Sequence, residues 1–335
     1  MAARSDAGVR SLLFTQPRRL LSRNVWTVGV YGLLAVMFLV TFIINPRFGA
    51  FDLISLALGA LAPSFAAAAE AVVIFAAGID LSVGALISVG NVLSASWMVH
   101  ASFGESLLLA VAVLVVMAIA GFVDGLLVVL TKVPDIVVTL AMSFVWSGVA
   151  LLILAQPGGG APSGFVALAT GTFLLPWIPT AFVILVAVIA VVWIPIRSHR
   201  VGLSIFAVGS DRQAAARSGV NVARGRLAAY TLGGFFAGAA GVALTMNTGT
   251  GDPLSGSAFT LTAVATVVLG GVSLLGGRGG LLGPLAGAYI LELLATDLVF
   301  LGISPSYAEV IQGVIIVLIV MAGGLAALRQ MRRAK

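Results

Sequence analysis

The chain has 335 residues, of which 60% are hydrophobic and 9% are charged, whereas soluble proteins carry about 25% charged residues. Its 18 basic and 12 acidic side chains are too few to solvate a globule of 34.1 kDa, and the mean hydropathy of +1.16 agrees. These values exclude a soluble enzyme and predict an integral membrane protein. Because the chain has no cysteine and only two histidines, His100 and His199, we predict no catalytic residue and no metal site.

Ten apolar segments approach the roughly 20 residues that a helix needs to cross about 30 Å of hydrocarbon. They predict an all-α polytopic bundle of about ten transmembrane helices, which occupies residues 25–327 as a single domain. A basic N-terminal segment, residues 1–24, precedes this domain, and a basic tail, residues 328–335, follows it. The predicted spans are residues 25–44, 53–77, 82–99, 106–129, 136–154, 173–195, 227–246, 258–275, 281–300 and 308–327.

The distribution of basic residues decides the predicted orientation. A net charge of +6 could indicate nucleic acid, but the Lys and Arg residues cluster between apolar runs, which is the pattern that orients membrane proteins. With the N-terminus inside, the cytoplasmic segments hold 17 basic residues and the outside holds one, Arg47. We therefore predict cytoplasmic N and C termini, a cytoplasmic loop at 196–226 and no nucleic-acid partner.

Two connections between spans contain more than an ordinary turn requires. In the first, residues 78–84, Asp80 or Ser82 can cap the following helix by accepting its free N–H groups. The second, residues 270–280, is rich in glycine, which permits a tight reversal and close backbone approach. The sequence leaves open whether each is a simple turn or a re-entrant element. Neither is a phosphate-binding loop, because no lysine of this chain follows a glycine.

Two glutamates, Glu70 and Glu292, fall deepest within predicted spans, where an ionisable group is costly. Each is either a structural, hydrogen-bonded carboxyl or part of a transport pathway, including one for protons. Asp124 lies nearer the inner end of its span, where we expect it to pair or to cap. The glycines of residues 233–241 are three to four apart, a spacing that favours close packing between helices.

The predicted cytoplasmic loop, residues 196–226, contains the signals of a short helix at about 210–219. Asp211 is a sound N-cap, alanines follow it, and Gly219 is a sound C-terminal stop. Such a helix outside the membrane is either an electrostatic anchor to anionic lipid or a docking helix for a cytoplasmic partner, and we favour the docking helix.

Several blocks carry a resemblance to a known family, and their order and spacing match it over roughly residues 25–327. They are Ala-Gly-Ile-Asp-Leu-Ser-Val-Gly at 77–84, Val-Pro at 133–134 with Thr-Leu at 139–140, residues 209–220, Val-Val-Leu-Gly-Gly-Val-Ser at 267–273, and Gly-Gly-Arg-Gly at 276–279. In these blocks the chain resembles the permease subunits of ribose-type sugar ABC importers, in the branched-chain amino acid/ribose permease superfamily. It departs from the family pattern at Ala77, where glycine is common, and at Asp135, where an apolar residue is usual.

The resemblance implies a multi-pass protein of the bacterial inner membrane and three protein partners: a second permease subunit, identical or related, a cytoplasmic ATP-binding subunit that holds ATP and Mg, and an extracytoplasmic solute-binding protein. It implies no cofactor in this chain. The expected ATPase-coupling residues are Gly209, Ser210, Asp211, Ala214, Ala215, Ser218 and Gly219. The expected translocation-path residues are Glu70, Asp80, Ser82, Asn91, Ser273 and Glu292.

The predicted function is import of a sugar or a similar small polar solute by alternating access, driven by ATP hydrolysis in the partner and dependent on the binding protein. This chain itself is then not an enzyme, because a permease needs only different contacts in two states. The alternative is a proton-coupled secondary transporter that uses Glu70 and Glu292.

Overall fold

The computed structural model describes residues 25–304, 306–308, 310–318 and 321. The described residues form helices joined by turns, with two isolated β-bridges and no strand. In chain order the helices are α2 (Val25–Ile44), α3 (Ala50–Phe75), α4 (Val83–Met98), α5 (Phe103–Thr131), α6 (Asp135–Ile153), α7 (Ser163–Thr170), α8 (Thr180–Val188), a π-helical stretch (Ile189–Trp193), α9 (Ile194–Ser198), α10 (Arg200–Ser210), α11 (Arg212–Arg217), α12 (Val222–Thr248), α13 (Phe259–Leu269) and α14 (Leu282–Phe300).

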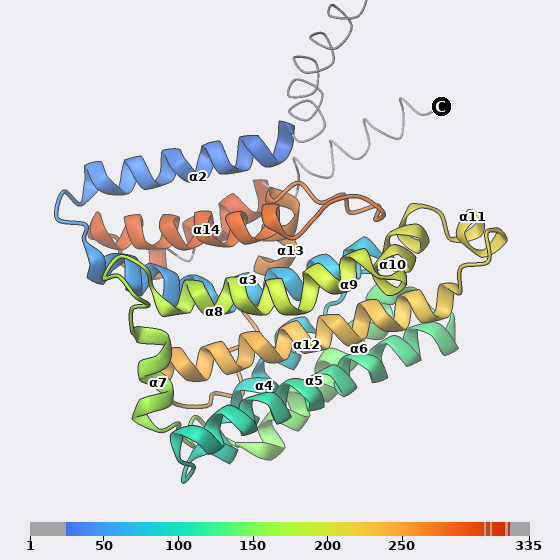
Figure 1. The fold of residues 1–335 in the computed structure, drawn as a ribbon, viewed down its shortest axis with the longest axis horizontal. Coiled ribbons are helices and arrows are strands. Elements are labelled where there is room, and N and C mark those ends of the chain that lie inside the picture. Colours follow the sequence, from blue (N-terminus) through green and yellow to red (C-terminus); the bar gives the residue numbers. More distant parts are fainter. Residues whose placement is uncertain (1–24, 305, 309, 319–320, 322–335) are drawn as a thin grey trace, which may run out of the picture.

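Seven helices of the described chain are long and apolar enough to cross a membrane. Their axes lie roughly along one direction in Figure 1, with α7 at one end of the bundle and α11 at the other. The fold class is therefore the predicted all-α membrane bundle. The seven spans are Trp26–Ile44, Ala50–Phe75, Phe103–Thr131, Asp135–Ile153, Thr180–Ser198, Val222–Thr248 and Leu282–Phe300.

Two of the ten predicted spans, residues 82–99 and 258–275, are not full-length helices. The 16 residues of α4 cover about 24 Å and the 11 residues of α13 about 17 Å, against roughly 30 Å of hydrocarbon. Non-helical chain precedes each of these helices. The count of about ten was therefore approximate. The last predicted span, residues 308–327, lies partly outside the described residues, and the predicted segments 1–24 and 328–335 lie entirely outside them.

Helix α3 lies at the centre of the bundle. In its most apolar 18-residue window 83% of the residues are buried, and a run of small side chains, Ala66–Ala69, is fully buried. Helix α12 packs against α3, α4 and α5. The predicted glycine packing is confirmed, because a Cβ on Gly234 of α12 would lie 2.2 Å from the Met117 carbonyl oxygen and 2.8 Å from the Gly121 backbone of α5.

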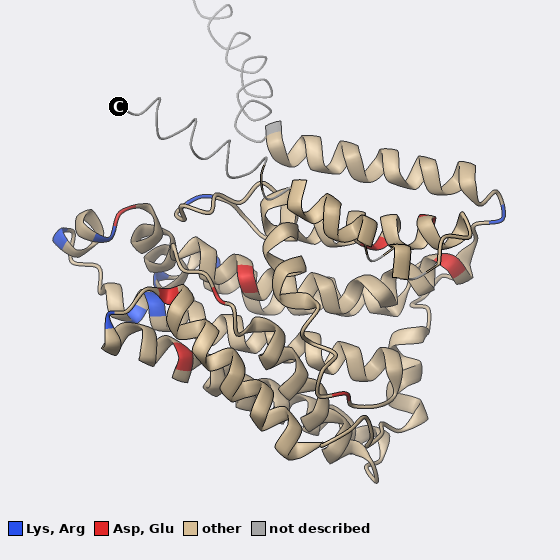
Figure 2. Ribbon diagram, turned by 180° about the vertical axis from the view of Figure 1, so that it is seen from behind, with Lys and Arg blue, Asp and Glu red and all other residues tan. Residues whose placement is uncertain are grey.

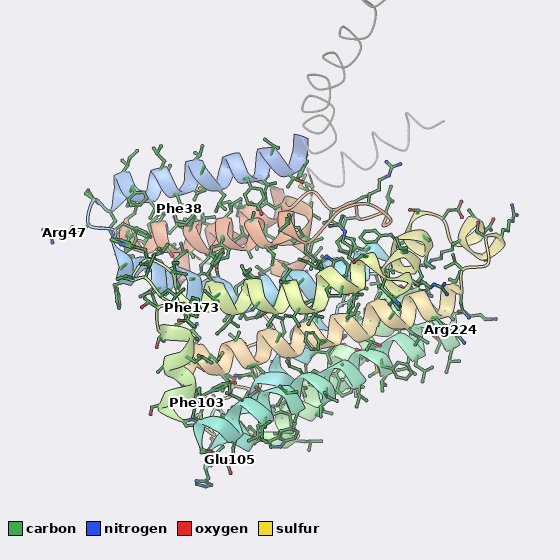
Figure 3. All side chains as sticks on the ribbon, viewed as in Figure 1. Phe38, Arg47, Phe103, Glu105, Phe173 and Arg224 are labelled. Carbon is green, nitrogen blue, oxygen red and sulfur yellow. The ribbon has the colours of Figure 1, made fainter. Side chains whose placement is uncertain are left out.

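Charged residues gather toward the ends of the bundle. In Figure 2 most Lys and Arg residues of the described chain lie at the end that carries α10 and α11, while several Asp and Glu residues lie inside. Figure 3 labels Arg224 at this end and Arg47 at the opposite one. This separation is what the orientation derived from the basic residues requires. We refer to the α11 end as the cytoplasmic end on that basis.

Candidate functional site

The reversal between α3 and α4, residues 76–82, is stabilised by buried polar side chains. A carboxylate oxygen of Asp80 accepts the backbone N–H of Ser82 at 2.9 Å, which stabilises the turn before α4. The predicted cap was wrong, because α4 begins at Val83 and no side chain of the described residues accepts one of its free N–H groups. The Ser82 hydroxyl lies between two carboxylates, hydrogen-bonded to Asp80 and 2.9 Å from an oxygen of Asp124 on α5. The indole N–H of Trp146 on α6 donates to Asp124 at 2.9 Å. Four polar side chains thus join the reversal to α5 and α6.

Glu70 lies directly behind this reversal, one turn before the end of α3, and is fully buried. One of its oxygens accepts the backbone N–H of Asp80 at 3.4 Å, and the other has no hydrogen-bond partner among the described residues. The structure therefore brings together three of the predicted path residues, Glu70, Asp80 and Ser82. It also confirms that Asp124 pairs. No sequence pattern indicated Trp146, because a single tryptophan in an apolar segment is an ordinary feature of membrane helices.

A second polar group lies along α4, where residues 249–258 return from the end of α12 toward the bundle interior. Asn91 of α4 donates to the Thr245 hydroxyl at 2.8 Å and to the Thr250 carbonyl at 3.2 Å, and it accepts the backbone N–H of Asp252 at 2.7 Å. One turn earlier on α4, the Ser88 hydroxyl accepts the backbone N–H of Gly256 at 2.9 Å. Non-helical backbone at membrane depth must be satisfied by protein or must line a water-filled cavity. The side chains of Asn91 and Ser88 provide some of the hydrogen bonds that the backbone of residues 249–258 needs.

Two predicted path residues lie elsewhere. The Ser273 hydroxyl accepts the backbone N–H of Leu275 at 3.3 Å, a local turn contact. Glu292 of α14 faces α3 beside Gly59, where a Cβ would collide with its carboxylate. Because Gly59 and Glu70 are 11 residues apart on α3, the two glutamates are separated by about 16 Å along that helix. The predicted path residues therefore occupy several separate places.

Asp135, which departs from the family pattern, is paired in this chain. At the start of α6 its carboxylate forms an ion pair with Arg226 of α12 and accepts the Tyr230 hydroxyl at 3.0 Å. A Cβ on Gly78 would lie 2.9 Å from this carboxylate and 3.0 Å from the Tyr230 oxygen. The acidic residue therefore joins α6 and α12 beside the α3–α4 reversal.

The predicted short helix is α11, and its boundaries follow the predicted signals. The Asp211 carboxylate accepts the backbone N–H groups of Gln213 and Ala214 at 2.8 and 3.0 Å. Gly219 ends the helix with a φ of +82°, and the Val220 N–H reaches back to the Ala215 carbonyl at 3.0 Å. Glycine adopts this left-handed conformation without the penalty that a Cβ imposes.

The predicted coupling residues divide into two groups. Asp211, Ala214, Ser218 and Gly219 are exposed at the end of the bundle. Gly209 and Ala215 are buried, and Ser210 hydrogen-bonds to Gly277. Ala215 therefore belongs to the packing of the loop itself, whereas an alanine-rich docking face on α11 would present Ala214. The sequence also did not predict α10 as a separate helix.

The two glycine-containing connections, which the sequence could not classify, are non-helical reversals that touch one another. The backbone N–H of Gly277 donates to the Phe75 carbonyl oxygen at 3.1 Å. The end of α10 lies against both, because a Cβ on Gly209 would be 1.9 Å from the Phe75 oxygen and 2.7 Å from the Gly277 nitrogen. The predicted coupling loop therefore contacts both reversals directly.

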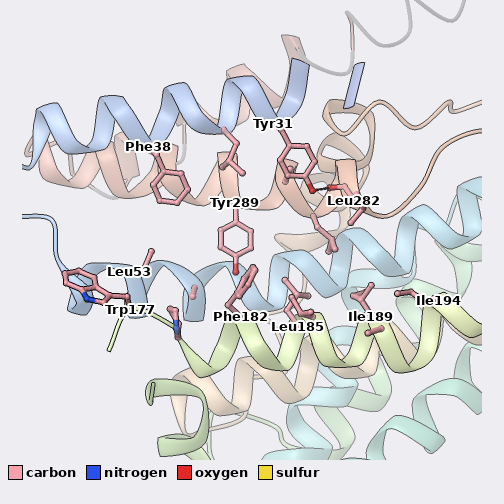
Figure 4. A pocket seen from close by; sticks show the side chains of 17 residues that line it. Tyr31, Phe38, Leu53, Trp177, Phe182, Leu185, Ile189, Ile194, Leu282 and Tyr289 are labelled. Atoms are coloured by element: carbon pink, nitrogen blue, oxygen red, sulfur yellow. Dashed lines mark hydrogen bonds between the residues drawn. The ribbon is translucent and has the colours of Figure 1, made fainter. Parts of the chain in front are cut away.

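A cavity of about 500 Å³ lies between α2, α3, α8 and α14, and its close-up is Figure 4. Aliphatic and aromatic side chains line most of it, among them Phe38, Phe182 and Leu185. Figure 4 shows Tyr289 extending across it from α14. A hydroxyl-rich solute would lose most of its hydrogen bonds here, which is costly. The cavity does not fit a polar solute, and we place the candidate site at the polar reversals instead.

Comparison with known proteins identifies the family of this chain. The family model described as "Branched-chain amino acid transport system / permease component" matches residues 52–320, most of the chain. The chain belongs to this permease family. It is 33% identical to the ribose import permease protein of Bacillus subtilis over 74% of this chain and 77% of that protein. Identity to the ribose import permease protein of Escherichia coli K12 is 30%, over 89% and 94%. Identity to the fructose import permease protein of Rhizobium meliloti is 31%, over 76% and 72%.

No solved structure matches the chain. Family membership and the apolar helices make the chain a multi-pass permease component of the bacterial inner membrane. Among the described residues, no group of three or more His, Cys, Asp or Glu side chains could hold a metal ion. The site thus consists of two helix reversals, their buried polar side chains and the loop that packs on them.

Proposed function

We propose that this permease imports a sugar or a similar small polar solute, driven by ATP hydrolysis in a separate cytoplasmic subunit that binds ATP and Mg. The observation that supports this most directly is the direct packing of the α10–α11 loop on both helix reversals. A displacement of α11 is therefore transmitted to the reversals through direct contacts. The relatives named for ribose and fructose import support a sugar as the solute.

The proposed partners follow from the same arrangement. An ATP-binding subunit docks on the exposed face of α11, which includes Ala214 and Ser218. An extracytoplasmic binding protein delivers solute at the opposite end, where α7 lies (Figure 1). A second permease subunit, identical or related, completes the membrane unit, and lipid covers the remaining apolar surface.

The polar groups of the reversals are the proposed parts of the translocation path. Asp80, Ser82 and Asn91 stabilise non-helical chain, and such chain can change its backbone angles more readily than a continuous helix. Alternating access then requires only that solute and ATP state favour different arrangements of these segments. No residue of this chain needs to form or break a covalent bond.

Proton coupling through Glu70 and Glu292 gains no support. The two carboxyls lie about 16 Å apart along α3, too far for direct proton transfer from one to the other. Uptake driven by ATP should survive a protonophore and stop with vanadate. Uptake that a protonophore abolishes while ATP remains present would refute the proposal.

Docking is tested by adding a charge to the exposed face of α11. Ala214→Glu places a carboxylate where the ATPase must approach closely, so the ATPase should no longer co-purify with the permease, and uptake should fall with it. Ala167→Glu, the same change on the exposed side of α7 at the opposite end, is the matched control and should retain the ATPase. Equal ATPase recovery from both variants would show that α11 is not the docking helix.

A further inference from the structure

Three chain segments that are far apart in sequence meet at the cytoplasmic end of α3. They are the end of α3 (residues 75–77), the connection between α10 and α11 (residues 209–212) and the glycine pair at 276–277. We call this meeting point the junction. Its parts belong to the predicted coupling loop and to both reversals.

Close approach of backbone segments holds much of the junction together. Besides the Gly277-to-Phe75 hydrogen bond, a Cβ on Gly277 would lie 2.3 to 2.6 Å from three atoms of Ser210. A Cβ on Gly276 would lie 2.7 to 2.8 Å from Ala77. Surfaces in direct backbone contact cannot absorb a displacement by changing rotamers, so movement of one segment displaces the others.

Two side-chain hydrogen bonds tie the coupling loop to the reversals. The guanidinium of Arg212, the first residue of α11, donates to the Ala77 carbonyl oxygen at 3.0 Å. The Ser210 hydroxyl donates to the Gly277 carbonyl oxygen at 3.4 Å. Both acceptors are backbone carbonyls in segments without a helical ladder, which leaves them free to accept. Arg212 is thus placed between the docking helix and the end of the central helix.

Ala77 makes this link sensitive to displacement. Its φ is +56°, in the left-handed region that a residue with a Cβ disfavours. The junction holds a conformation that the residue by itself disfavours, and the Arg212 guanidinium binds the carbonyl of that same residue. A shift of α11 that draws this guanidinium away therefore changes the balance between two backbone conformations at the reversal.

We propose that Arg212 and Ser210 are the positioning residues through which movement of α11 reaches both reversals at once, one through Ala77 and the other through Gly277. Neither residue needs to touch the solute or ATP. The inference rests on the proposed function, since it assumes that an ATPase moves α11. It adds that docking and transmission depend on different residues of the same loop.

Arg212→Ala tests transmission apart from docking. The variant removes the donor to Ala77 and leaves the exposed alanine, Ala214, unchanged. We expect the ATPase to co-purify and to hydrolyse ATP within about two-fold of the parent. Uptake of labelled ribose, fructose or galactose, whichever the parent transports, should fall about ten-fold or more, the order expected from one hydrogen bond to a charged donor. Arg224→Ala removes an exposed guanidinium from the same end of the bundle and should leave both activities unchanged.

A readout that needs no known solute uses the absence of cysteine from the chain. Ser257→Cys places one exposed thiol on the non-helical chain before α13. In the parent background its maleimide labelling rate should differ between nucleotide-free and ATP–vanadate states, and Arg212→Ala should abolish that difference. Ser210→Ala, which introduces no new atoms, should also reduce this labelling difference. The test therefore does not depend on the correct folding of a single variant.

The outcomes separate the two proposals. Loss of the ATPase from Arg212→Ala would make Arg212 a docking residue and would overturn transmission through it. Uptake by Arg212→Ala at the parental rate would also overturn transmission through Arg212. A labelling difference that stays undiminished in both Arg212→Ala and Ser210→Ala would do the same. A parent that transports none of the three sugars but keeps the labelling difference would contradict the proposed solute and leave the junction supported.

Discussion

Replacement of Asn91 by alanine should destabilise the non-helical chain between α12 and α13. The Asn91 side chain is 1% exposed and donates to the Thr245 hydroxyl and the Thr250 carbonyl while accepting the Asp252 N–H. The variant would leave the Thr250 oxygen and the Asp252 nitrogen without this partner. Thr245 is affected least, because its hydroxyl still donates to backbone carbonyls.

The size of this destabilisation depends on how many hydrogen-bond partners of Asn91 are left unsatisfied and on whether water can reach them. A buried polar group left without a partner costs about 1–3 kcal/mol. The Thr250 carbonyl is exposed and keeps the Thr248 hydroxyl as a donor at 2.9 Å, and Asp252 is only half-buried, so the lower part of the range applies to the Asp252 N–H alone. We expect Asn91→Ala to cost about 1–2 kcal/mol, with a fall of about 2 °C or more in the thermal midpoint of the detergent-solubilised permease. Uptake should fall as well.

Ser94→Ala is the matched control for this measurement. Ser94 lies one turn further along α4 and is fully buried, but its hydroxyl donates only to the Gly90 carbonyl of its own helix at 2.7 Å. That carbonyl keeps its place in the helical ladder, so the control should change the midpoint by less than about 1 °C. Equal midpoints for Asn91→Ala and Ser94→Ala would refute the argument that Asn91 supports the neighbouring chain.

Two further predictions concern packing and orientation. Gly234→Ala should force α5 and α12 apart because its Cβ would lie 2.2 Å from the Met117 oxygen, at a cost of about 2–3 kcal/mol. Gly32→Ala on α2 has open space at its Cβ and should be neutral or slightly stabilising, and a thermal midpoint for Gly234→Ala at or above that of Gly32→Ala would contradict the packing. Single cysteines should label differently with an impermeant maleimide outside intact cells: Ser163→Cys should react and Ser218→Cys should not, both being exposed. The reverse pattern would invert the assigned orientation.

Features that depend on neighbouring residues could be predicted from the sequence. The run of apolar residues in α2 gave its span, and Asp211 and Gly219 gave the ends of α11, because a cap bonds within a few residues of itself. The glycine spacing of α12 correctly indicated close helix packing, although it did not name α5 as the partner.

Contacts between segments that are distant in the sequence could not be predicted, or were predicted wrongly. Residues 258–275 are apolar enough to suggest a span, yet helix forms only over Phe259–Leu269, because Gly271 turns the chain with a φ of +78° and Gly270 packs against the backbone of Gly283 and Pro284. Ala215 lies in an alanine run that suggests an exposed face, and tertiary packing buries it. Path residues that were grouped by chemistry, such as Ser273 and Glu292, fall in different places.

The sequence by itself determined that this chain spans a membrane many times, which end carries the basic charge and where a short helix leaves the bundle. Each of these follows from local composition and from the solvation cost of individual side chains. Only the tertiary structure decided that Arg212 reaches Ala77 across 135 residues and that Asn91 supports Thr250 across 159. Such pairings depend on how helices pack in three dimensions, and no local pattern encodes which carbonyl a distant side chain will meet.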